Sequence, residues 1–271
     1  MTNNPSASPV VLTIAGFDPS GGAGIIADAR TLIAFDCRPV AAMTSLTFQN
    51  SQTFFGSIHQ TAESLRAQIE PLVKEFHIVA VKIGMLPTRE LVFEVARLVR
   101  ETKMPAPVVD PVLHSSSGHE LMEPAAREAW LTELMPLARL ITPNIPEAEA
   151  LTGMAVRNEC DMRAVAAKLR ERGSGAILVK GGHLWQRSEV GGQRSEQSGP
   201  RRQAIDVLDD GGTVTVLRGE WIDGPPVRGT GCMLSTAIAA GLARGMNLPK
   251  SVSSAKQFVG RAIRYASIGT F

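Results

Sequence analysis

The chain has 271 residues, a length that fits one α/β domain. Hydrophobic residues make up 44% and charged residues 20%, which excludes a globally disordered chain. The net charge of +2 gives no reason to expect a nucleic acid or an anionic membrane as partner. Three widely spaced cysteines, Cys37, Cys160 and Cys232, form no zinc motif and indicate a reducing compartment, for which we expect the cytoplasm.

Strand-like and helical patterns alternate along the first half of the chain. Val10–Ala15 is a continuous apolar run, typical of a strand covered on both faces. Thr44–Ile58 is uncharged and predicts a β hairpin or flap, and Pro71 predicts a break or kink in its helix. In chain order we expect strand Val10–Ala15, helix Ile25–Phe35, strand Pro39–Met43, the flap, helix 62–76, strand Ile78–Ile83, a helix with its apolar stripe over 91–99, and strand Val108–Val109.

The alternation continues to the C-terminus. Asp209-Asp210-Gly211-Gly212 separates two strand-like runs and is a strong hairpin signal. The uncharged stretch Gly229–Ala243 is too short to span a bilayer and predicts a buried helix. The further expected elements are helix 124–135, strand Leu140–Thr142, helix Pro146–Leu151, helix 161–172, strand Ala176–Val179, hairpin strands Ala204–Leu208 and Thr213–Arg218, and helices over about 230–244 and 250–268.

This alternation predicts an α/β fold with a doubly wound, mostly parallel central sheet, helices on both faces, and an antiparallel edge from the late hairpin. Residues 1–271 are expected to form one domain, because no segment has the composition of a linker. Trp185–Arg202 is rich in Gly, Ser, Gln and Arg and lacks periodicity, so we expect a mobile surface loop over 185–202. Residues 1–8 are expected to be disordered.

Unusual residues follow successive predicted strands, at the edge where open α/β sheets bind their ligands. Any one of these segments is compatible with an ordinary loop. Five of them at corresponding strand ends predict one shared site. They are Gly16–Gly24, Gly84-Met85, Asp110-Pro111-Val112, Pro143–Glu147 and Lys180–His183.

The segment Arg228-Gly229-Thr230-Gly231-Cys232 opens an uncharged helix rich in small residues. Glycines let backbone amides turn toward a ligand, and the helix N-terminus adds partial positive charge, so the segment could bind an anion. Cys232 would lie in the first turn, where the helix dipole favours a thiolate. From these residues alone, tight helix packing with Cys232 as a small core residue explains the pattern equally well.

Charged residues at other strand ends extend the candidate phosphate site. Lys180 closes a hydrophobic strand and could reach a phosphate, although a lysine at a strand end can also simply extend its ammonium into water. Asp110 and Glu147 could hold magnesium, which usually keeps several waters and takes only one or two carboxylates. The structural alternatives are turn capping by Asp110 and a helix-start acid at Glu147.

Two common phosphate-binding motifs do not account for this pattern. A P-loop needs Gly-Lys before Ser or Thr, and the chain contains no Gly-Lys pair. Gly22–Ala27 fits the dinucleotide pattern G-x-G-x-x-A, but six residues separate it from the first strand. The second strand, Pro39–Met43, also lacks the terminal acid that would bind ribose. The sequence therefore disfavours a nicotinamide or flavin enzyme.

Taken together, seven motifs in order resemble the ribokinase-like kinases, and among them the hydroxymethylpyrimidine/phosphomethylpyrimidine kinases of thiamine biosynthesis. The resemblance covers nearly the whole chain. The motifs are Thr13–Gly24, Gln49-Asn50, Val81–Leu86, Asp110-Pro111-Val112, Thr142–Ala148, Leu178–His183 and Gly229-Thr230-Gly231-Cys232. The resemblance implies a ribokinase-like fold, ATP and Mg²⁺ as cofactors, and a homodimer with the flap near the interface.

The resemblance also implies a reaction, in which ATP phosphorylates 4-amino-5-hydroxymethyl-2-methylpyrimidine and then its monophosphate, and three groups of residues that serve it. The catalytic group would be the base Cys232 and the backbone amides of Gly229, Thr230 and Gly231. The pyrimidine pocket would be lined by Gly16, Asp28, Gln49, Met85 and Val112. The ATP phosphates would be bound by Lys180, Asn144 and Gly182, with the metal at Asp110 and Glu147.

Several residues depart from the family pattern. Phe17 stands where Thr or Ser is usual, Ser115-Ser116 where Lys or Thr is common, and Arg228 where His is usual. A pyridoxal or pyridoxine kinase of the same subfamily remains an alternative, and so does a non-catalytic pyrimidine-binding protein. Gln49 favours the pyrimidine kinase, because an amide can complement a ring nitrogen and its neighbouring amine. The intact set of Lys180, Asn144, Glu147 and Gly-Thr-Gly-Cys argues against binding alone.

Overall fold

The computed structural model describes residues 8–115, 118–182, 203–223 and 227–267. Within these residues, nine strands form one sheet with the order β3-β2-β1-β4-β5-β6-β7-β8-β9. The strands are β1 (Val10–Phe17), β2 (Arg38–Gln49), β3 (Phe54–His59), β4 (Ile78–Ile83), β5 (Val108–Val109), β6 (Leu140–Ile141), β7 (Ala176–Lys180), β8 (Gln203–Asp210) and β9 (Thr213–Glu220).

Parallel pairing runs through the centre of the sheet, from β2 through β1, β4, β5 and β6 to β7. Antiparallel pairing closes both edges, where β3 pairs with β2 and where β8 and β9 follow β7. The mostly parallel sheet and the late hairpin are therefore confirmed. The hairpin turn is Gly211-Gly212, while Asp209 and Asp210 belong to β8.

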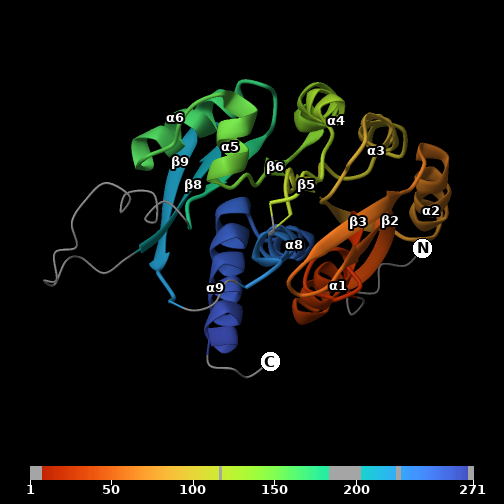
Figure 1. Ribbon diagram of the computed structural model, residues 1–271, viewed down its shortest axis with the longest axis horizontal. Coiled ribbons are helices and arrows are strands. Elements are labelled where there is room, and N and C mark those ends of the chain that lie inside the picture. Colours follow the sequence, from red (N-terminus) through yellow and green to blue (C-terminus); the bar gives the residue numbers. More distant parts are fainter. Residues whose placement is uncertain (1–7, 116–117, 183–202, 224–226, 268–271) are drawn as a thin grey trace, which may run out of the picture.

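Helices cover both faces of the sheet, as Figure 1 shows. Helices α2 to α6 pack on one face, and α1, α8 and α9 on the other. Among the described helices, none combines the length and hydrophobicity of a membrane-spanning segment. The bounds are α1 (Gly24–Ala34), α2 (Ala62–Glu75), α3 (Arg89–Glu101), α4 (Pro124–Ala129), α5 (Ile145–Thr152), α6 (Glu159–Arg170), α8 (Thr230–Ala243) and α9 (Leu248–Ser267).

Alternation along β1 divides the core between the two faces. Leu12 and Ile14 belong to the cluster under α2 to α6, whereas Val11 belongs to the cluster under α1, α8 and α9. All three side chains are fully buried. Successive side chains of a strand point to opposite faces, so a continuous apolar run is what a strand covered on both faces requires. The doubly wound arrangement predicted from Val10–Ala15 is thus confirmed.

Two predicted boundaries are wrong, and the helix break considered at Pro71 is absent. β2 does not end at Met43 but continues to Gln49, because the flap is the outer half of this strand paired with β3. α2 runs through Pro71 without a break. A proline removes only one backbone hydrogen bond of the helix, and the buried Leu65 and Ile69 hold α2 on the sheet. The helix predicted over 124–135 divides after Ala129 into a π turn and a 3₁₀ turn that contains Pro136.

Two sequence predictions concern segments that the structure does not describe. The surface loop Trp185–Arg202 lies outside the described residues, and so does the N-terminal segment up to residue 7. The motif Leu178–His183 is described up to Gly182.

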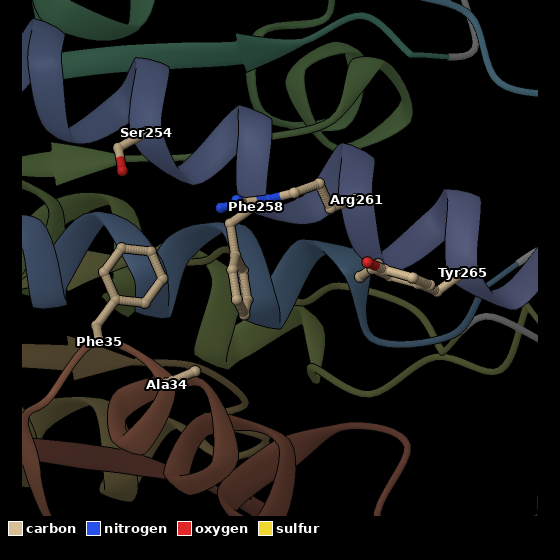
Figure 2. Close-up of a pocket in the computed structure, with 7 residues that line it drawn as sticks. Ala34, Phe35, Ser254, Phe258, Arg261 and Tyr265 are labelled. Atoms are coloured by element: carbon tan, nitrogen blue, oxygen red, sulfur yellow. The ribbon is translucent and has the colours of Figure 1, made fainter. Parts of the chain in front are cut away.

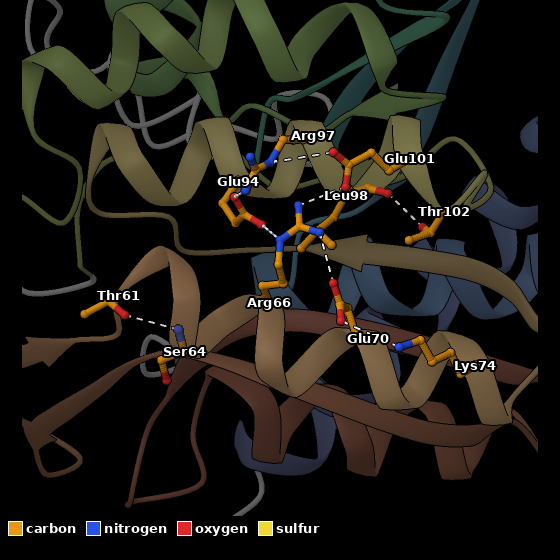
Figure 3. A network of polar contacts seen from close by, with 10 residues as sticks. All are labelled: Thr61, Ser64, Arg66, Glu70, Lys74, Glu94, Arg97, Leu98, Glu101 and Thr102. Carbon is orange, nitrogen blue, oxygen red and sulfur yellow. Dashed lines mark hydrogen bonds and ion pairs between the residues drawn. The ribbon is translucent and has the colours of Figure 1, made fainter.

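An ionic network joins α2 to α3 (Figure 3). Arg66 of α2 lies 3.1 Å from Glu70 on its own helix and 2.9 Å from Glu101 on α3, and its Nε also donates to the buried Glu94. The N-cap of α2, Thr61, accepts a hydrogen bond from the Ser64 N–H directly after β3. The chain that leaves β3 therefore leads directly into α2, and the ionic network fixes α2 to α3.

A buried ion pair joins the centre of the sheet to two helices of the other face. Lys82 on β4 and Asp28 on α1 have no exposed surface, and the ammonium lies 2.8 and 3.0 Å from the two carboxylate oxygens. Thr13 of β1 and Thr236 of α8 donate their hydroxyls to the same carboxylate at 2.6 and 2.7 Å. Although burial favours the neutral amine, the charge of Asp28 raises the pKa of Lys82, so Lys82 stays protonated.

Replacing Lys82 alone should destabilise the fold strongly. Lys82→Met keeps the length of the side chain but leaves the Asp28 charge buried without its cation, so we expect the free energy of unfolding to fall by about 3–5 kcal/mol. The double variant Lys82→Met/Asp28→Asn should recover most of this loss, because a neutral amide can accept from one threonine hydroxyl and donate to the other. Urea unfolding measures both effects.

The matched control for this experiment is Lys74→Met, since the Lys74 side chain on α2 is 76% exposed. Its effect should stay within about 0.5 kcal/mol of wild type. A Lys82→Met variant as stable as Lys74→Met would contradict the structural role of the ion pair.

Candidate active site

Two glycine-rich loops pack against each other at the carboxyl ends of the central strands. A Cβ at Gly229, before α8, would lie 2.0 Å from the carbonyl oxygen of Gly22, after β1. A Cβ at Gly24 would lie 2.1 Å from the carbonyl oxygen of Gly16. Gly229 and Gly24 also have positive φ angles of 73° and 59°. Only glycine tolerates both the close approach and the positive φ angle. The loop after β1 and the loop before α8 therefore pack directly against each other and form one wall of the site.

Helix α8 begins at this wall with its N-terminus open toward the site. Its N-cap is Gly229, which has no side chain to accept from the first turn. The first backbone N–H groups of a helix have no partner within the helix, and together with the dipole they favour an anion. A Cβ at Gly231 would lie 3.3 Å from the Lys180 ammonium and 3.5 Å from Asp110 Oδ2. The helix N-terminus and a lysine therefore meet at the same place.

Lys180 and Asp110 form an ion pair beside this helix start. The Lys180 ammonium lies 2.9 Å from Asp110 Oδ1, which also accepts from the Thr142 hydroxyl at 2.9 Å. Burial would raise the pKa of Asp110, but Lys180 and Lys82 together hold it below its ordinary value. Burial likewise opposes the charge on Lys180, whereas Asp110 and Glu147 raise its pKa. Both members of the pair are therefore charged at neutral pH.

Asn144 and Glu147 form a capping box at the start of α5. The Asn144 side chain accepts from the Glu147 N–H, and the Glu147 carboxylate accepts from the Asn144 N–H, both at 2.8 Å. Burial raises the pKa of Glu147 to about 7, with Lys180 opposing the rise and Asp110 adding to it. The helix-start role of Glu147 is thus confirmed, while its role toward a metal stays a prediction.

The donor set of Asp110 and Glu147 fits magnesium. Both carboxyls are nearly buried, the charge of Asp110 raises the pKa of Glu147, and Asp110 Oδ2 faces the start of α8. Within the described residues, no group of three or more His, Cys, Asp and Glu side chains gathers as a metal site. Magnesium needs no such group, because it takes one or two carboxylates together with water and substrate phosphates.

The prediction of a low pKa for Cys232 is wrong. Cys232 lies half-buried in the first turn of α8, and this burial raises the pKa of its thiol. Lys82 and the Gly24 amide act in the opposite direction, but Asp28 and Asp110 add to the rise. Desolvation and the two carboxylates outweigh Lys82 and the Gly24 amide, so the thiol is neutral at pH 7 in the free protein.

Four of the residues predicted to line the pyrimidine pocket lie on or after neighbouring strands: Gly16 on β1, Met85 after β4, Val112 after β5 and Gln49 on the flap. A Cβ at Gly16 would lie 3.1 Å from the sulfur of Met85, which is 7% exposed. Thr44 of β2 donates its hydroxyl to the Met85 carbonyl at 2.8 Å. The Val112 N–H donates to the Asp110 carbonyl at 2.9 Å, which holds Val112 in the turn after β5. Gly16 and Met85 are therefore in contact, and Val112 lies in the turn that follows Asp110.

Gln49 connects the flap to the loop before α8. Its Nε2 donates to the Thr47 hydroxyl at 2.8 Å, and its Oε1 accepts from Arg228 at 2.6 Å. Arg228 also donates to the Asn50 carbonyl and lies 3.7 Å from Asp18. The sequence marked Arg228 only as a departure from the family pattern, and its partners 178 and 179 residues away could not be found from local spacing.

One predicted residue does not join the site as expected, and another stays a prediction. Asp28 has no exposed surface and is occupied by Lys82 and two threonines, so it does not line an accessible pocket. Gly182 follows Lys180, but a Cβ on it would meet nothing within 4 Å, and its role stays a prediction. Sequence reasoning also gave no role to Lys82, although a charged residue inside the apolar strand Ile78–Ile83 was a usable signal.

A surface hollow of about 490 Å³ lies elsewhere, between the end of α1 and α9 (Figure 2). Phe35, Phe258 and Tyr265 are among its lining residues, and none of the predicted site residues lines it. The candidate site is therefore defined by its glycine-rich loops and its charged side chains.

The capping box yields a test of the shifted Glu147. A carboxyl with a raised pKa in the folded state stabilises the fold fully below about pH 4.5 and loses this contribution as the pH rises through about 7. Glu147→Gln keeps the capping box, because Gln also serves at this position, but it cannot ionise. Between these pH values, wild type should therefore lose roughly 2–3 kcal/mol of unfolding free energy relative to the variant.

Urea unfolding at a series of pH values in EDTA measures this difference. Glu75→Gln, at an exposed position of α2, is the matched control and should follow wild type. Parallel curves for wild type and Glu147→Gln would show that the shift is absent.

Comparisons with known proteins show which family the chain belongs to. Residues 18–270 match the family model described as phosphomethylpyrimidine kinase. The chain is 40% identical over 259 residues to the hydroxymethylpyrimidine/phosphomethylpyrimidine kinase of Streptomyces coelicolor, which covers 96% of this chain and 90% of that protein.

Solved structures show the same relationship. A phosphomethylpyrimidine kinase from Clostridium difficile superposes with a TM-score of 0.79 at 34% identity, over 94% of this chain and 100% of that one. An ADP complex of Bacillus subtilis pyridoxal kinase superposes with a TM-score of 0.82 at 32% identity, over 95% of this chain and 92% of that one. Both the ribokinase-like fold and the family predicted from the seven motifs are confirmed: the chain belongs to the phosphomethylpyrimidine kinases.

Proposed function

We propose that this chain transfers a phosphoryl group from ATP to the hydroxymethyl group of 4-amino-5-hydroxymethyl-2-methylpyrimidine, and then phosphorylates the monophosphate to the diphosphate, in thiamine biosynthesis. The observation that carries the proposal is the meeting of an open helix N-terminus with Lys180 and Asp110 at Gly231. Phosphoryl transfer leaves a protein mainly to position the reactants and neutralise charge, and this arrangement supplies both. The similar Streptomyces protein carries the name of this activity.

Residues around the start of α8 would each neutralise part of the negative charge on the phosphates. The backbone amides of Thr230 and Gly231 would face the moving phosphoryl group, and the Lys180 ammonium would face the nucleotide side. When bound, Mg²⁺ would neutralise charge on the phosphates, held by Asp110 and Glu147. The Lys180 ammonium, paired with Asp110 Oδ1 at 2.9 Å, would lie next to the same phosphates.

Cys232 is the proposed base for the alcohol. It follows Gly231 directly in the first turn of α8, so a hydroxyl that attacks a phosphate at this turn is next to the thiol. Because burial leaves the thiol neutral in the free protein, Cys232 would first give its own proton to water. The resulting thiolate, whose charge Lys82 offsets, would then accept the proton of the alcohol. The proton would thus leave the alcohol as the phosphoryl group arrives.

Pyridoxal phosphorylation is the second candidate function, because the structurally similar Bacillus subtilis protein is a pyridoxal kinase. The Gln49 amide favours the aminopyrimidine, whose ring nitrogen and amine it can complement. An ADP-release assay should give a kcat/KM for the hydroxymethylpyrimidine at least about 10-fold above that for pyridoxal. The opposite order would assign the chain to pyridoxal, and binding without ADP release would make it a binding protein.

Removing the thiol should slow the first phosphorylation. We expect Cys232→Ala to lower kcat for the alcohol by about 10²–10⁴-fold, the usual contribution of a general base, with little change in pyrimidine binding. The second step should suffer less, because a phosphate monoester oxygen is already ionised. Steady-state kinetics with both substrates measure the two effects.

The control is Cys160→Ala, since Cys160 is an exposed free cysteine on α6, away from α8. If Cys232→Ala kept the wild-type kcat for the alcohol, the thiol would serve only in packing, and a water would be the remaining candidate base.

We also propose a homodimer that covers the flap. Leu46, Phe48 and Ile58 are exposed, and the pairing of Leu46 with Ile58 and of Phe48 with Gly56 places them on one face of the flap. Light scattering at micromolar concentration should give a dimer for wild type and a monomer for Phe48→Ser/Ile58→Ser. A wild-type monomer would refute the proposal, and Val214→Ser, at another exposed apolar residue, is the control.

A further inference from the structure

Arg228 joins the start of α8 to the flap. In the chain it directly precedes Gly229, the N-cap of α8. Its Nη2 donates to Gln49 Oε1 at 2.6 Å, and its Nη1 donates to the Asn50 carbonyl. The guanidinium therefore lies beside the amide that is expected to bind the pyrimidine ring, and the residue itself borders the turn that is expected to bind phosphate.

The guanidinium keeps donors for a further ligand. It carries five N–H groups, and the bonds to Gln49 and Asn50 use one on each Nη, so within the described residues three N–H groups have no hydrogen-bond partner. The Asp18 carboxylate lies 3.7 Å away, too far for a hydrogen bond, and its Oδ2 is itself without a hydrogen-bond partner. Because the Arg228 side chain is 23% exposed, a ligand can reach these donors.

The two lysines of the site differ from Arg228 in this respect. Lys82 is fully buried, and its ammonium lies 2.8 and 3.0 Å from the two carboxylate oxygens of Asp28. Lys180 lies 2.9 Å from Asp110 Oδ1 and is the proposed ligand of the nucleotide phosphates. Arg228 makes no hydrogen bond to a carboxylate of the described chain and has no part in binding the nucleotide. Of these three cations, it is therefore the one available to a further anion.

The second substrate of the proposed reaction brings such an anion. Both substrates must present their attacking oxygen at the start of α8, where the phosphoryl group arrives. In the alcohol, one carbon separates this oxygen from the ring, whereas in the monophosphate an ester oxygen and a phosphorus atom stand between as well. The two other terminal oxygens of this phosphate therefore lie between the start of α8 and the ring at Gln49, which is the gap that Arg228 spans.

We infer that Arg228 binds the phosphate group of the pyrimidine monophosphate, and so serves the second phosphorylation but not the first. A phosphate monoester carries about 1.5 to 2 negative charges at pH 7, and the paired N–H groups of a guanidinium match two of its oxygens. The inference rests on the proposed function and adds a binding residue for its second substrate. Lys180 and the amides of Thr230 and Gly231 would serve the phosphoryl group that ATP donates in both steps.

Support of the flap is the alternative role of Arg228, and it predicts a different outcome. The Thr47 hydroxyl donates to the Phe17 carbonyl at 2.8 Å, so it can only accept from Gln49 Nε2. The orientation of the Gln49 amide therefore does not depend on Arg228, and its contact with the ring should survive the loss of the guanidinium. A residue that only supports the flap would matter equally for both substrates, whereas a phosphate ligand matters for one.

The experiment compares the KM values of the two substrates in Arg228→Met. The KM for the monophosphate should rise by about 10–100-fold, the range expected for losing a charge-assisted hydrogen bond, while the KM for the alcohol rises less than about 3-fold. Arg228→Lys keeps the charge but not the paired donors, so its KM for the monophosphate should lie between those of wild type and Arg228→Met.

The matched control is Arg244→Met at the other end of α8, where Arg244 donates to the Phe35 carbonyl and pairs with Asp36. It should leave the ratio of the two KM values unchanged. If Arg228→Met does not fold, Arg228→Gln provides the same comparison, because it keeps N–H donors for the flap but carries no charge. Calorimetric titration with each pyrimidine in the absence of ATP repeats the comparison in Kd without turnover.

An equal rise in both KM values, or an unchanged KM for the monophosphate in Arg228→Met, would overturn the inference and leave the proposed function intact. A wild-type protein that neither binds nor phosphorylates the two pyrimidines refutes the proposed function, and the inference with it.

Discussion

The buried carboxylate of Asp28 organises the half of the molecule that carries the site. It keeps Lys82 protonated inside the sheet and accepts hydroxyls from Thr13 and Thr236. Thr236 lies one helical turn after Cys232, so the contact that fixes α8 to the sheet also fixes the side of the helix on which the thiol lies. The ion pair thus contributes position as well as stability, and position is what a reacting group requires.

Charge in the site is balanced before any ligand arrives. Asp28 and Asp110 offset Lys82 and Lys180, and burial keeps Glu147 largely protonated below about pH 7. A nucleoside triphosphate therefore enters a site whose side chains carry no excess of positive charge. The helix N-terminus supplies only partial charge, so a divalent cation on Asp110 and Glu147 is the addition that would make the site accommodate the phosphates.

Local patterns predicted the central sheet and the late hairpin, because apolar runs and the glycines of a tight turn are readable within a few residues. Contacts between distant segments were not readable in this way. Asp28 and Lys82 are 54 residues apart, and the sequence resemblance assigned Asp28 to the pocket while the fold buries it. The start of α8 was visible from Gly229–Cys232, but the desolvation that raises the Cys232 pKa depends on the strands packed beneath it. β2 was cut short at Met43 because its outer half carries the mixed polarity of a flap.

The double pairing of β2 has a mechanical consequence. Ser45 and Leu46 bond to β1 on one side and to β3 on the other, so no hinge loop separates the flap from the sheet. The flap is a cantilever, clamped at these two residues, and its tip is held by side-chain contacts, among them those of Arg228 with Gln49 and Asn50. Any deflection grows from the clamp to the tip, so elastic bending of one strand would separate Gln49 from Arg228 long before it disturbed the contact of Gly16 with Met85.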